Sequence, residues 1–241
     1  MHHQKQKNMN NFRNMQKVTP EVIERLEFIL NELEKENCTL EIKVELHEIE
    51  EKYDLYDCIF EENDKKGVKD IKGNVRVPAI YKDYSLRYAF HHLRKAPIPA
   101  ENEDGKYALI KADGTGTPIT SFEYDWISLV PFTSLFIAEK NGKEGLVSFE
   151  GEVIVPCELD SVSNGVPMNG LIELTNDNKY GLFDYKTGLY VKPIFDQLEE
   201  NNDNVYVRLN DHWGYLDEEG NFIDEADVET WENCYLLNWL E

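Results

Sequence analysis

The chain has 241 residues, of which 41% are hydrophobic and 12% aromatic, and this apolar content is enough for a folded domain and excludes a disordered chain. Its 47 acidic and 25 basic side chains give a net charge of −22. Such a charge repels phosphate backbones and anionic lipids, so we expect neither nucleic acid nor a membrane surface as a partner. The charge favours a basic protein partner, or it serves only to keep the chain in solution.

The cysteines and the N-terminal residues bear on the compartment. Cys38, Cys58, Cys157 and Cys234 lie far apart and form no C-x-x-C pair, a pattern typical of reduced thiols. The first residues form no apolar signal-like run, and no stretch approaches the roughly 18 apolar residues of a membrane helix. We therefore expect a cytoplasmic protein without a membrane span.

The N-terminal part is expected to form a small cap. Residues 1–17 are rich in Asn, Gln and Lys and are predicted to be a disordered leader. A helix should begin at Thr19 and Pro20, because threonine suits the N-cap and proline the first helical position. Apolar and charged residues then alternate over 40–46, which predicts a half-buried strand. Residues 18–52 are therefore expected to form a helix–strand cap.

From residue 53 to residue 225 one short pattern recurs about five times. Its centres are Lys66-Gly67-Val68, Tyr107-Ala108-Leu109, Glu144-Gly145-Leu146, Tyr180-Gly181-Leu182 and Trp213-Gly214-Tyr215. A second glycine follows six or seven residues after each centre, at Gly73, Gly114, Gly151, Gly188 and Gly220. A proline comes next in four copies, at Pro78, Pro118, Pro156 and Pro193. Three copies end on an apolar–acidic pair, Tyr124-Asp125, Leu159-Asp160 and Phe195-Asp196, and the first has only Tyr81 with Asp83.

The repeating pattern predicts a three-stranded β-meander. The central glycine lies within a strand, where a missing Cβ allows a close backbone approach or a bulge. The second glycine suits a turn that requires positive φ. One such meander is too small to be stable alone, so neighbouring units should stack. We expect a mainly β fold of tandem meanders in an open or propeller-like array, closed by an amphipathic helix over 226–241.

These residues resemble the WG repeat family, a bacterial repeat with a Lys-Trp-Gly-apolar-Asp core, a glycine turn, a proline segment and an aromatic–Asp pair. The copy around Trp213-Gly214 is the best match, and the copy at Lys179-Tyr180-Gly181 is next. Glu144 replaces the aromatic residue of the third copy, and Ala108 replaces the glycine of the second. The resemblance covers about residues 53–225. It implies a β-repeat binding scaffold and no catalytic residues.

The sequence contains no recognisable catalytic, nucleotide-binding or zinc motif, so we expect no catalytic residue, no cofactor and no metal. Adjacent His91 and His92 would point to opposite faces of a strand, which disfavours joint metal binding. The acidic run 199–204 has oxygen ligands for calcium, but it lacks the order of a known calcium loop. A solvated linker between repeats is the preferred interpretation of that run.

One aromatic and basic cluster stands out on this acidic chain. Tyrosine and arginine are favoured at protein interfaces, so the cluster is a candidate interaction surface, with ordinary packing of an irregular connection as the alternative. Its members are Tyr84, Arg87, Tyr88, His91, His92 and Arg94.

The leading functional hypothesis is a non-enzymatic protein–protein interaction module whose partner and oligomeric state the sequence leaves open. An acidic inhibitor or immunity-type protein that neutralises a basic toxin or enzyme is the alternative, because complementary charge speeds association. A hydrolase that uses scattered carboxylates is a second alternative.

Overall fold

The structure, a computed structural model, describes residues 19–33, 59–69, 73–85, 96–131, 133–163, 170–201, 204–217 and 219–224, together with Ile42, Glu45, Glu48, Ile49, Lys52 and Tyr53. The chain divides into two compact units. Unit 1 contains residues 1–128 and 149–151, and unit 2 contains residues 129–148 and 152–241. The predicted leader over 1–17 and the predicted helix over 226–241 lie outside the described residues.

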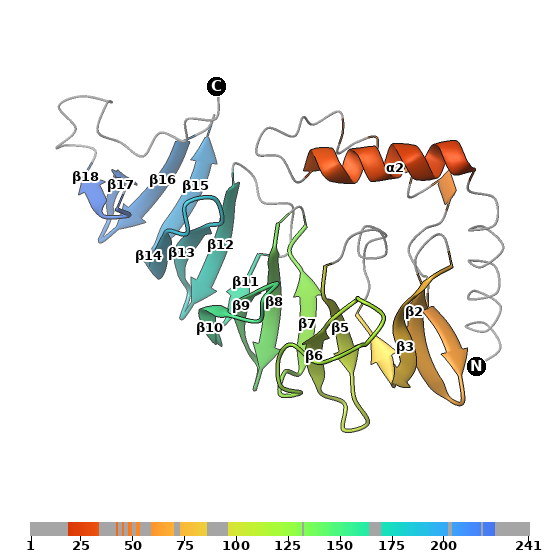
Figure 1. Ribbon diagram of the computed structural model, residues 1–241. Coiled ribbons are helices and arrows are strands. Elements are labelled where there is room, and N and C mark those ends of the chain that lie inside the picture. Colours follow the sequence, from red (N-terminus) through yellow and green to blue (C-terminus); the bar gives the residue numbers. More distant parts are fainter. Residues whose placement is uncertain are drawn as a thin grey trace. The chain divides into compact units, whose positions relative to one another are not determined.

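The described strands form five separate antiparallel sheets that follow one another in chain order (Figure 1). This confirms a mainly β fold built from repeated small sheets. The strands of the first two sheets are β1 (Ile59–Glu62), β2 (Lys65–Lys69) and β3 (Val75–Tyr81), then β4 (Asp83–Tyr84), β5 (Ile98–Glu101) and β6 (Tyr107–Ile110). The third sheet contains β7 (Trp126–Leu129), β8 (Leu135–Lys140), β9 (Lys143–Ser148) and β10 (Val153–Leu159). The fourth contains β11 (Ser161–Val162), β12 (Leu171–Asn176), β13 (Lys179–Asp184) and β14 (Tyr190–Phe195), and the fifth β15 (Gln197–Asn201), β16 (Asn204–Leu209), β17 (His212–Leu216) and β18 (Phe222–Asp224).

The helix α2 runs from Pro20 to Leu33, as its start signals predict (Figure 1). Thr19 occupies the N-cap, and its side-chain oxygen accepts a hydrogen bond from the backbone N–H of Val22 at 3.4 Å. Leu26 and Ile29, one turn apart, are fully buried. The apolar stripe of the sequence is therefore the packed face of the helix.

The strand predicted over 40–46 is wrong. Ile42 and Glu45 are helical, and so are Glu48, Ile49, Lys52 and Tyr53. Ile42, Glu45, Ile49 and Tyr53 are half-buried and three or four residues apart, the period of a helix face. The alternation spans too few residues to override this longer period. The carboxylate of Glu45 also binds the Arg25 guanidinium of α2 through two hydrogen bonds, of 2.6 and 2.7 Å.

Tight two-residue turns join the first and central strands of four repeats. Both turn residues have positive φ in each case, at Asn63-Asp64 (51° and 61°), Asn141-Gly142 (55° and 72°), Asp177-Asn178 (51° and 57°) and Asn210-Asp211 (51° and 69°). Such turns match the natural twist of an antiparallel pair, and asparagine, aspartate and glycine adopt them most readily. The second glycines, Gly73, Gly114, Gly151, Gly188 and Gly220, also have positive φ, between 79° and 94°, as expected.

The central glycine lets a bulged strand cross directly over it. In unit 2, Val155 of β10 is opposite Leu146 and Leu159 is opposite Glu144, so β10 advances four residues while β9 advances two. A Cβ on Gly145 would lie 2.4 Å from the Val155 carbonyl oxygen. The same irregularity recurs in β14 opposite Gly181, where a Cβ would lie 2.4 Å from the Val191 oxygen. The prolines lie in these bulges, where a missing N–H does no harm.

The second repeat lacks the central glycine and departs from this geometry. Its residue is Ala108, and the following segment forms no strand opposite β6 but meets it through two bridges, Tyr107 with Tyr124 and Ile110 with Pro118, and through backbone hydrogen bonds from Ile119 and Thr120 to Leu109. The first repeat retains Gly67, and β3 forms a bulged strand opposite it. The repeat with alanine at the crossing position is thus the one described repeat whose third segment is not a continuous strand.

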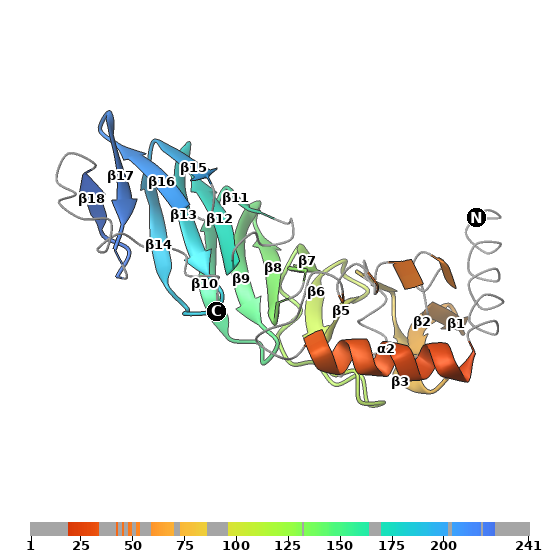
Figure 2. The ribbon, with the colours of Figure 1, turned by 90° about the horizontal axis from the view of Figure 1, so that it is seen from above.

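Within each unit, neighbouring sheets bury apolar cores between them, as predicted for units too small to be stable alone. Figure 2 shows the ribbons of the third and fourth sheets side by side. In unit 1, Val68 and Val77 of the first sheet pack with Ile98 and Ile110 of the second. In unit 2 one cluster joins the third and fourth sheets and another joins the fourth and fifth. Three of these sheets have four strands, not the three expected, because the residues after each closing acid add a further strand.

Replacing Gly181 by alanine should destabilise the protein by about 2–4 kcal/mol, because the new Cβ meets the backbone of β14, which cannot move without breaking the sheet. Gly188→Ala is the matched control. A Cβ there meets nothing within 4 Å, so this variant should lose about 1 kcal/mol of unfolding free energy, the cost of alanine in a left-handed backbone conformation. Urea unfolding of both variants measures the difference, and equal losses would contradict the close-approach account.

Candidate interaction surface

The predicted aromatic and basic surface is only partly described. Tyr84 is 7% exposed and packs in the core of unit 1, and its hydroxyl donates a hydrogen bond to the Lys66 carbonyl oxygen at 3.0 Å. Burial raises the pKa of its phenol well above the ordinary value. The structure therefore places Tyr84 in the core, not on a surface. The other predicted members, Arg87, Tyr88, His91, His92 and Arg94, lie outside the described residues.

Each repeat contains an ion pair between the start of its central strand and its closing acid. The pairs are Lys66–Asp83 at 2.7 Å, Lys106–Asp125, Lys143–Asp160 at 2.5 Å, Lys179–Asp196 and, with histidine in place of lysine, His212–Asp224 at 2.8 Å. The apolar residue before the acid is buried in four repeats, as Tyr81, Tyr124, Leu159 and Phe195 show. The apolar–acidic pair of the sequence is thus one core residue and one surface anion.

Two of these acids also hold the next repeat. The second carboxylate oxygen of Asp160 accepts a hydrogen bond of 2.7 Å from the N–H of Asp177, which lies in the following hairpin turn. Asp196 accepts the corresponding bond from Asn210 at 3.0 Å. Each carboxylate therefore joins the lysine of its own repeat to the turn of the next. The positive charges of Lys143 and Lys179, at the hairpin ends, are therefore paired with carboxylates.

Most of the exposed large apolar side chains lie on the third strands. Of the five described as exposed, four lie on these strands: Val75 and Ile80 on β3, Val153 on β10 and Ile194 on β14. Val153 is 58% exposed. Ile80 and Ile194 each come directly before the buried apolar residue that closes the third strand, and Glu158 occupies that position in the third repeat. One strand of the repeat unit thus presents apolar side chains to solvent.

These strands are at the sheet edges, but they are poor templates for another strand. β3, β10 and β14 each end the strand order of their sheet. Each contains a bulge and a proline, and both features blunt edge-to-edge pairing. A partner would therefore contact them through side chains and not through a continued backbone ladder.

The turn of the following repeat covers these strands unequally. In unit 1, a Cβ on Gly116 would lie 3.1 Å from both Val77 and Pro78 of β3. In unit 2, a Cβ on Gly220 would lie 2.6 Å from Val191 of β14. The corresponding turn after β10 contains Gly188, and a Cβ there would meet nothing within 4 Å. The space around a Cβ at Gly188 is therefore open.

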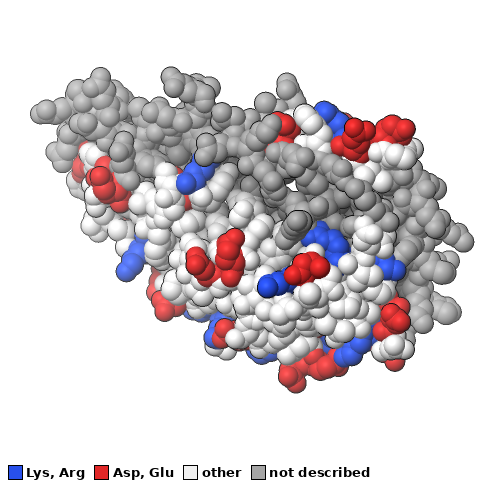
Figure 3. All heavy atoms as spheres, in the orientation of Figure 1, with Lys and Arg blue, Asp and Glu red and all other residues white. Residues whose placement is uncertain are grey.

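Charged side chains of both signs alternate over the described surface in the view of Figure 3, with white, uncharged stretches between them.

Within the described part of the chain, no group of three or more histidine, cysteine, aspartate or glutamate side chains could hold a metal ion. None of the helices in that part is long and apolar enough to cross a membrane.

We expected the acidic run 199–204 to be a solvated linker between repeats, and this prediction is wrong. Glu199 pairs with Tyr206 and Asn201 with Asn204 in the β15–β16 hairpin of the fifth sheet. Residues 202 and 203 lie outside the described residues. His212 is exposed and begins β17, where it contacts Asp224.

The sequence interpretation missed two features of this surface. The lysine or histidine at or directly before each centre was visible in the sequence, but its partner acid is 12 to 19 residues later, as the pairs His212–Asp224 and Lys106–Asp125 show. The exposed side chains of the third strands could not be separated from core residues, because a bulge shifts the alternation of inward and outward positions.

Comparisons with known proteins add no function. No family model and no curated protein matches the chain. Among solved structures, the computationally designed Ika4 protein has 10% identity and a TM-score of 0.28, covering 54% of this chain and 84% of that one. Ika8, another computational design, has 11% identity and a TM-score of 0.29 over 64% and 55%. The WD40 β-propeller domain of Doa1 has 15% identity and a TM-score of 0.27 over 62% and 56%. Likenesses at these scores carry no argument about this chain.

The stability of the protein should fall in acid as Asp160 and Asp196 lose their charge. Hydrogen bonds from Lys143 and from the Asp177 N–H lower the pKa of Asp160, and Lys179 lowers that of Asp196. A lowered folded-state pKa stabilises the fold above the ordinary aspartate pKa, about 3.9, and this contribution disappears as pH falls through the lowered value. Unfolding midpoints measured between neutral pH and the acid limb test this.

The double variant Asp160→Asn and Asp196→Asn should be less stable than the wild type at neutral pH and should lose less stability in acid. Glu173→Gln is the control for removing charge, because Glu173 is an exposed acid of β12 that forms no ion pair with a described residue, and it should follow the wild type. Parallel acid limbs for the wild type and the double variant would contradict the assigned role.

Proposed function

We propose that this chain is a non-enzymatic protein-binding module of the WG-repeat type, with the third strands of its repeats as the contact surface. The observation that supports this most directly is the placement of exposed apolar side chains, four of the five described lying on β3, β10 and β14. Exposed apolar residues gathered at one structural position, beside polar residues, are typical of protein interaction sites.

The repeat construction suits this role. In unit 2, the third, fourth and fifth sheets are held together by buried cores and by hydrogen bonds to Asp160 and Asp196, so their strands are positioned before a partner arrives. A surface that is already ordered loses little conformational entropy on binding. Within unit 2, side chains on the third strands of successive repeats can then contact one partner.

A second candidate is an acidic inhibitor of a basic protein. It is supported by the net charge of −22 and by the pairing of Lys66, Lys106, Lys143 and Lys179 with acids, which removes positive charge from the hairpin ends. An inhibitor of this kind would bind mainly by charge, and its association would weaken steeply with salt.

Recovering partners of the tagged full-length chain from its native cell lysate at low and high salt separates the two candidates. The binding-module proposal predicts a partner that is retained at high salt and released when Val153 and Ile194 are both changed to serine. Release by salt alone, with no effect of these substitutions, favours the inhibitor. Recovery of no protein at either salt concentration would contradict both proposals.

A further inference from the structure

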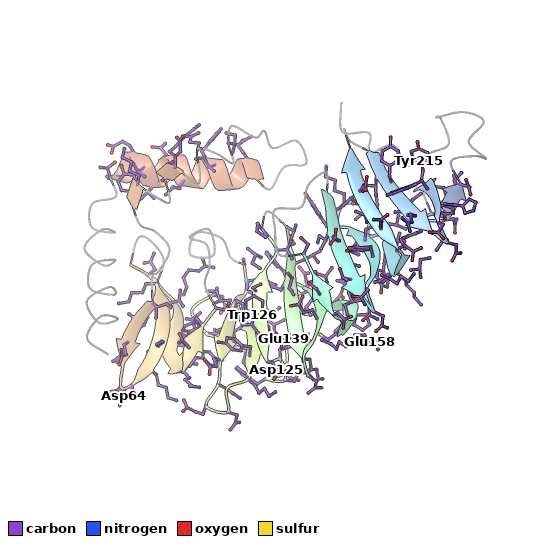
Figure 4. The ribbon with its side chains drawn as sticks, turned by 180° about the vertical axis from the view of Figure 1, so that it is seen from behind. Asp64, Asp125, Trp126, Glu139, Glu158 and Tyr215 are labelled. Atoms are coloured by element: carbon purple, nitrogen blue, oxygen red, sulfur yellow. The ribbon has the colours of Figure 1, made fainter. Side chains whose placement is uncertain are left out.

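We propose that the β10 surface, defined as Val153, Ile154, Glu158, Tyr185 and Tyr190, binds a segment of a partner protein that presents an arginine or lysine flanked by apolar side chains. This inference rests on the protein-binding function proposed above and names the surface and the chemistry of its partner. All five residues belong to unit 2. Figure 4 shows Glu158 at the outer margin of this part of the chain.

The five side chains form one neighbourhood. Ile154, Tyr185 and Tyr190 are half-buried, and all three pack against the core cluster between the third and fourth sheets. Val153 precedes Ile154 and is 58% exposed. Burial, and then the negative charge of Glu158, raise the pKa of the Tyr190 phenol, so this carboxylate of β10 acts electrostatically on the first residue of β14.

The glycine turn beside this neighbourhood has more open space than the turn that follows β14. The turn that follows β3 packs on Val77 and Pro78 through Gly116, and the turn that follows β14 packs on Val191 through Gly220. The turn containing Gly188 follows Tyr185 and precedes Tyr190, and its glycine has open space around it. The two tyrosines therefore flank a turn whose glycine no other part of the described chain covers.

The chemistry of the surface selects a cation with apolar neighbours. Glu158 is exposed and forms no ion pair with any described residue, so its charge is available to a partner. Tyrosine rings attract guanidinium and ammonium groups, and tyrosine is enriched where binding energy is concentrated. Val153 and Ile154 offer apolar area beside the carboxylate. An acidic or phosphorylated segment would be repelled.

A second copy of this chain is a poor occupant, because each copy has a net charge of −22. Strand addition is also disfavoured, since β10 is bulged between Val155 and Leu159 and contains Pro156. The partner segment should therefore dock through its side chains, with the cation at Glu158 and its apolar neighbours on Val153 and the tyrosines.

The test uses the full chain and a fluorescent synthetic peptide of alternating arginine and leucine, followed by anisotropy. A peptide with glutamate in place of arginine and one with serine in place of leucine control for charge and for apolar content. The surface variants are Val153→Ser and Glu158→Gln. The repeats supply matched controls: Val75→Ser removes the equivalent valine of β3, which is 45% exposed, and Glu173→Gln removes another exposed acid of unit 2.

The wild type should bind the arginine–leucine peptide and neither control peptide. Glu158→Gln should weaken binding about two- to fivefold and Val153→Ser about fivefold, whereas Val75→Ser and Glu173→Gln should leave it unchanged. Equal weakening by Glu158→Gln and Glu173→Gln would show that only net charge attracts the peptide and would overturn the proposed site. Absence of peptide binding would also overturn it.

Failure of this site and failure of the proposed function give different results. If the native-lysate experiment still recovers a partner that Val153→Ser and Glu158→Gln both leave bound, the chain binds proteins but not through the β10 surface. If no partner is recovered and the peptide does not bind, the binding function itself fails.

Discussion

The close crossing of the third strand over the central glycine is the constraint on which the rest of the repeat depends. The crossing leaves no room for a Cβ, since one on Gly145 or Gly181 would meet a backbone oxygen at 2.4 Å. It also sets the bulge, and the bulge sets where the proline lies and which residues of the strand face outward. In the second repeat, which has Ala108 at this position, the third segment meets β6 through bridges and single hydrogen bonds and forms no continuous strand.

Each further contact between repeats follows from where that strand ends. The buried apolar residue that closes the strand, such as Leu159 or Phe195, fills the core, and the acid after it turns outward to a lysine and to the next hairpin. The chain then enters the first strand of the next sheet. Exposed surface ion pairs stabilise little individually, so we regard these acids as fixing the register between repeats more than as a large source of stability. The apolar side chains left outside are the ones available to a partner.

Much of this fold could be predicted because its signals are local or recur. The turn glycines and the central glycines recur in the repeats, and a positive φ or a close backbone approach requires glycine there. The Asn141-Gly142 turn and the start of α2 carry local signals of their own. The strand expected at 40–46 failed, since a short alternation was weighed without the helical spacing that continues to Tyr53. Tyr84 was misplaced for another reason. Its burial depends on the second sheet packing over the first, which no local pattern encodes. The third strands' exposed residues were missed because a bulge breaks the period of two.

Hydrogen exchange of the Gly181→Ala protein, followed by mass spectrometry, tests the central claim most directly. If the glycine is what allows the third strand to cross, amide protection should be lost first in β14 and then in β15 and β16, which follow it, while β2 and β3 of unit 1 keep theirs. Protection of β14 that matches the wild type, with the alanine accommodated in the strand, would contradict the account.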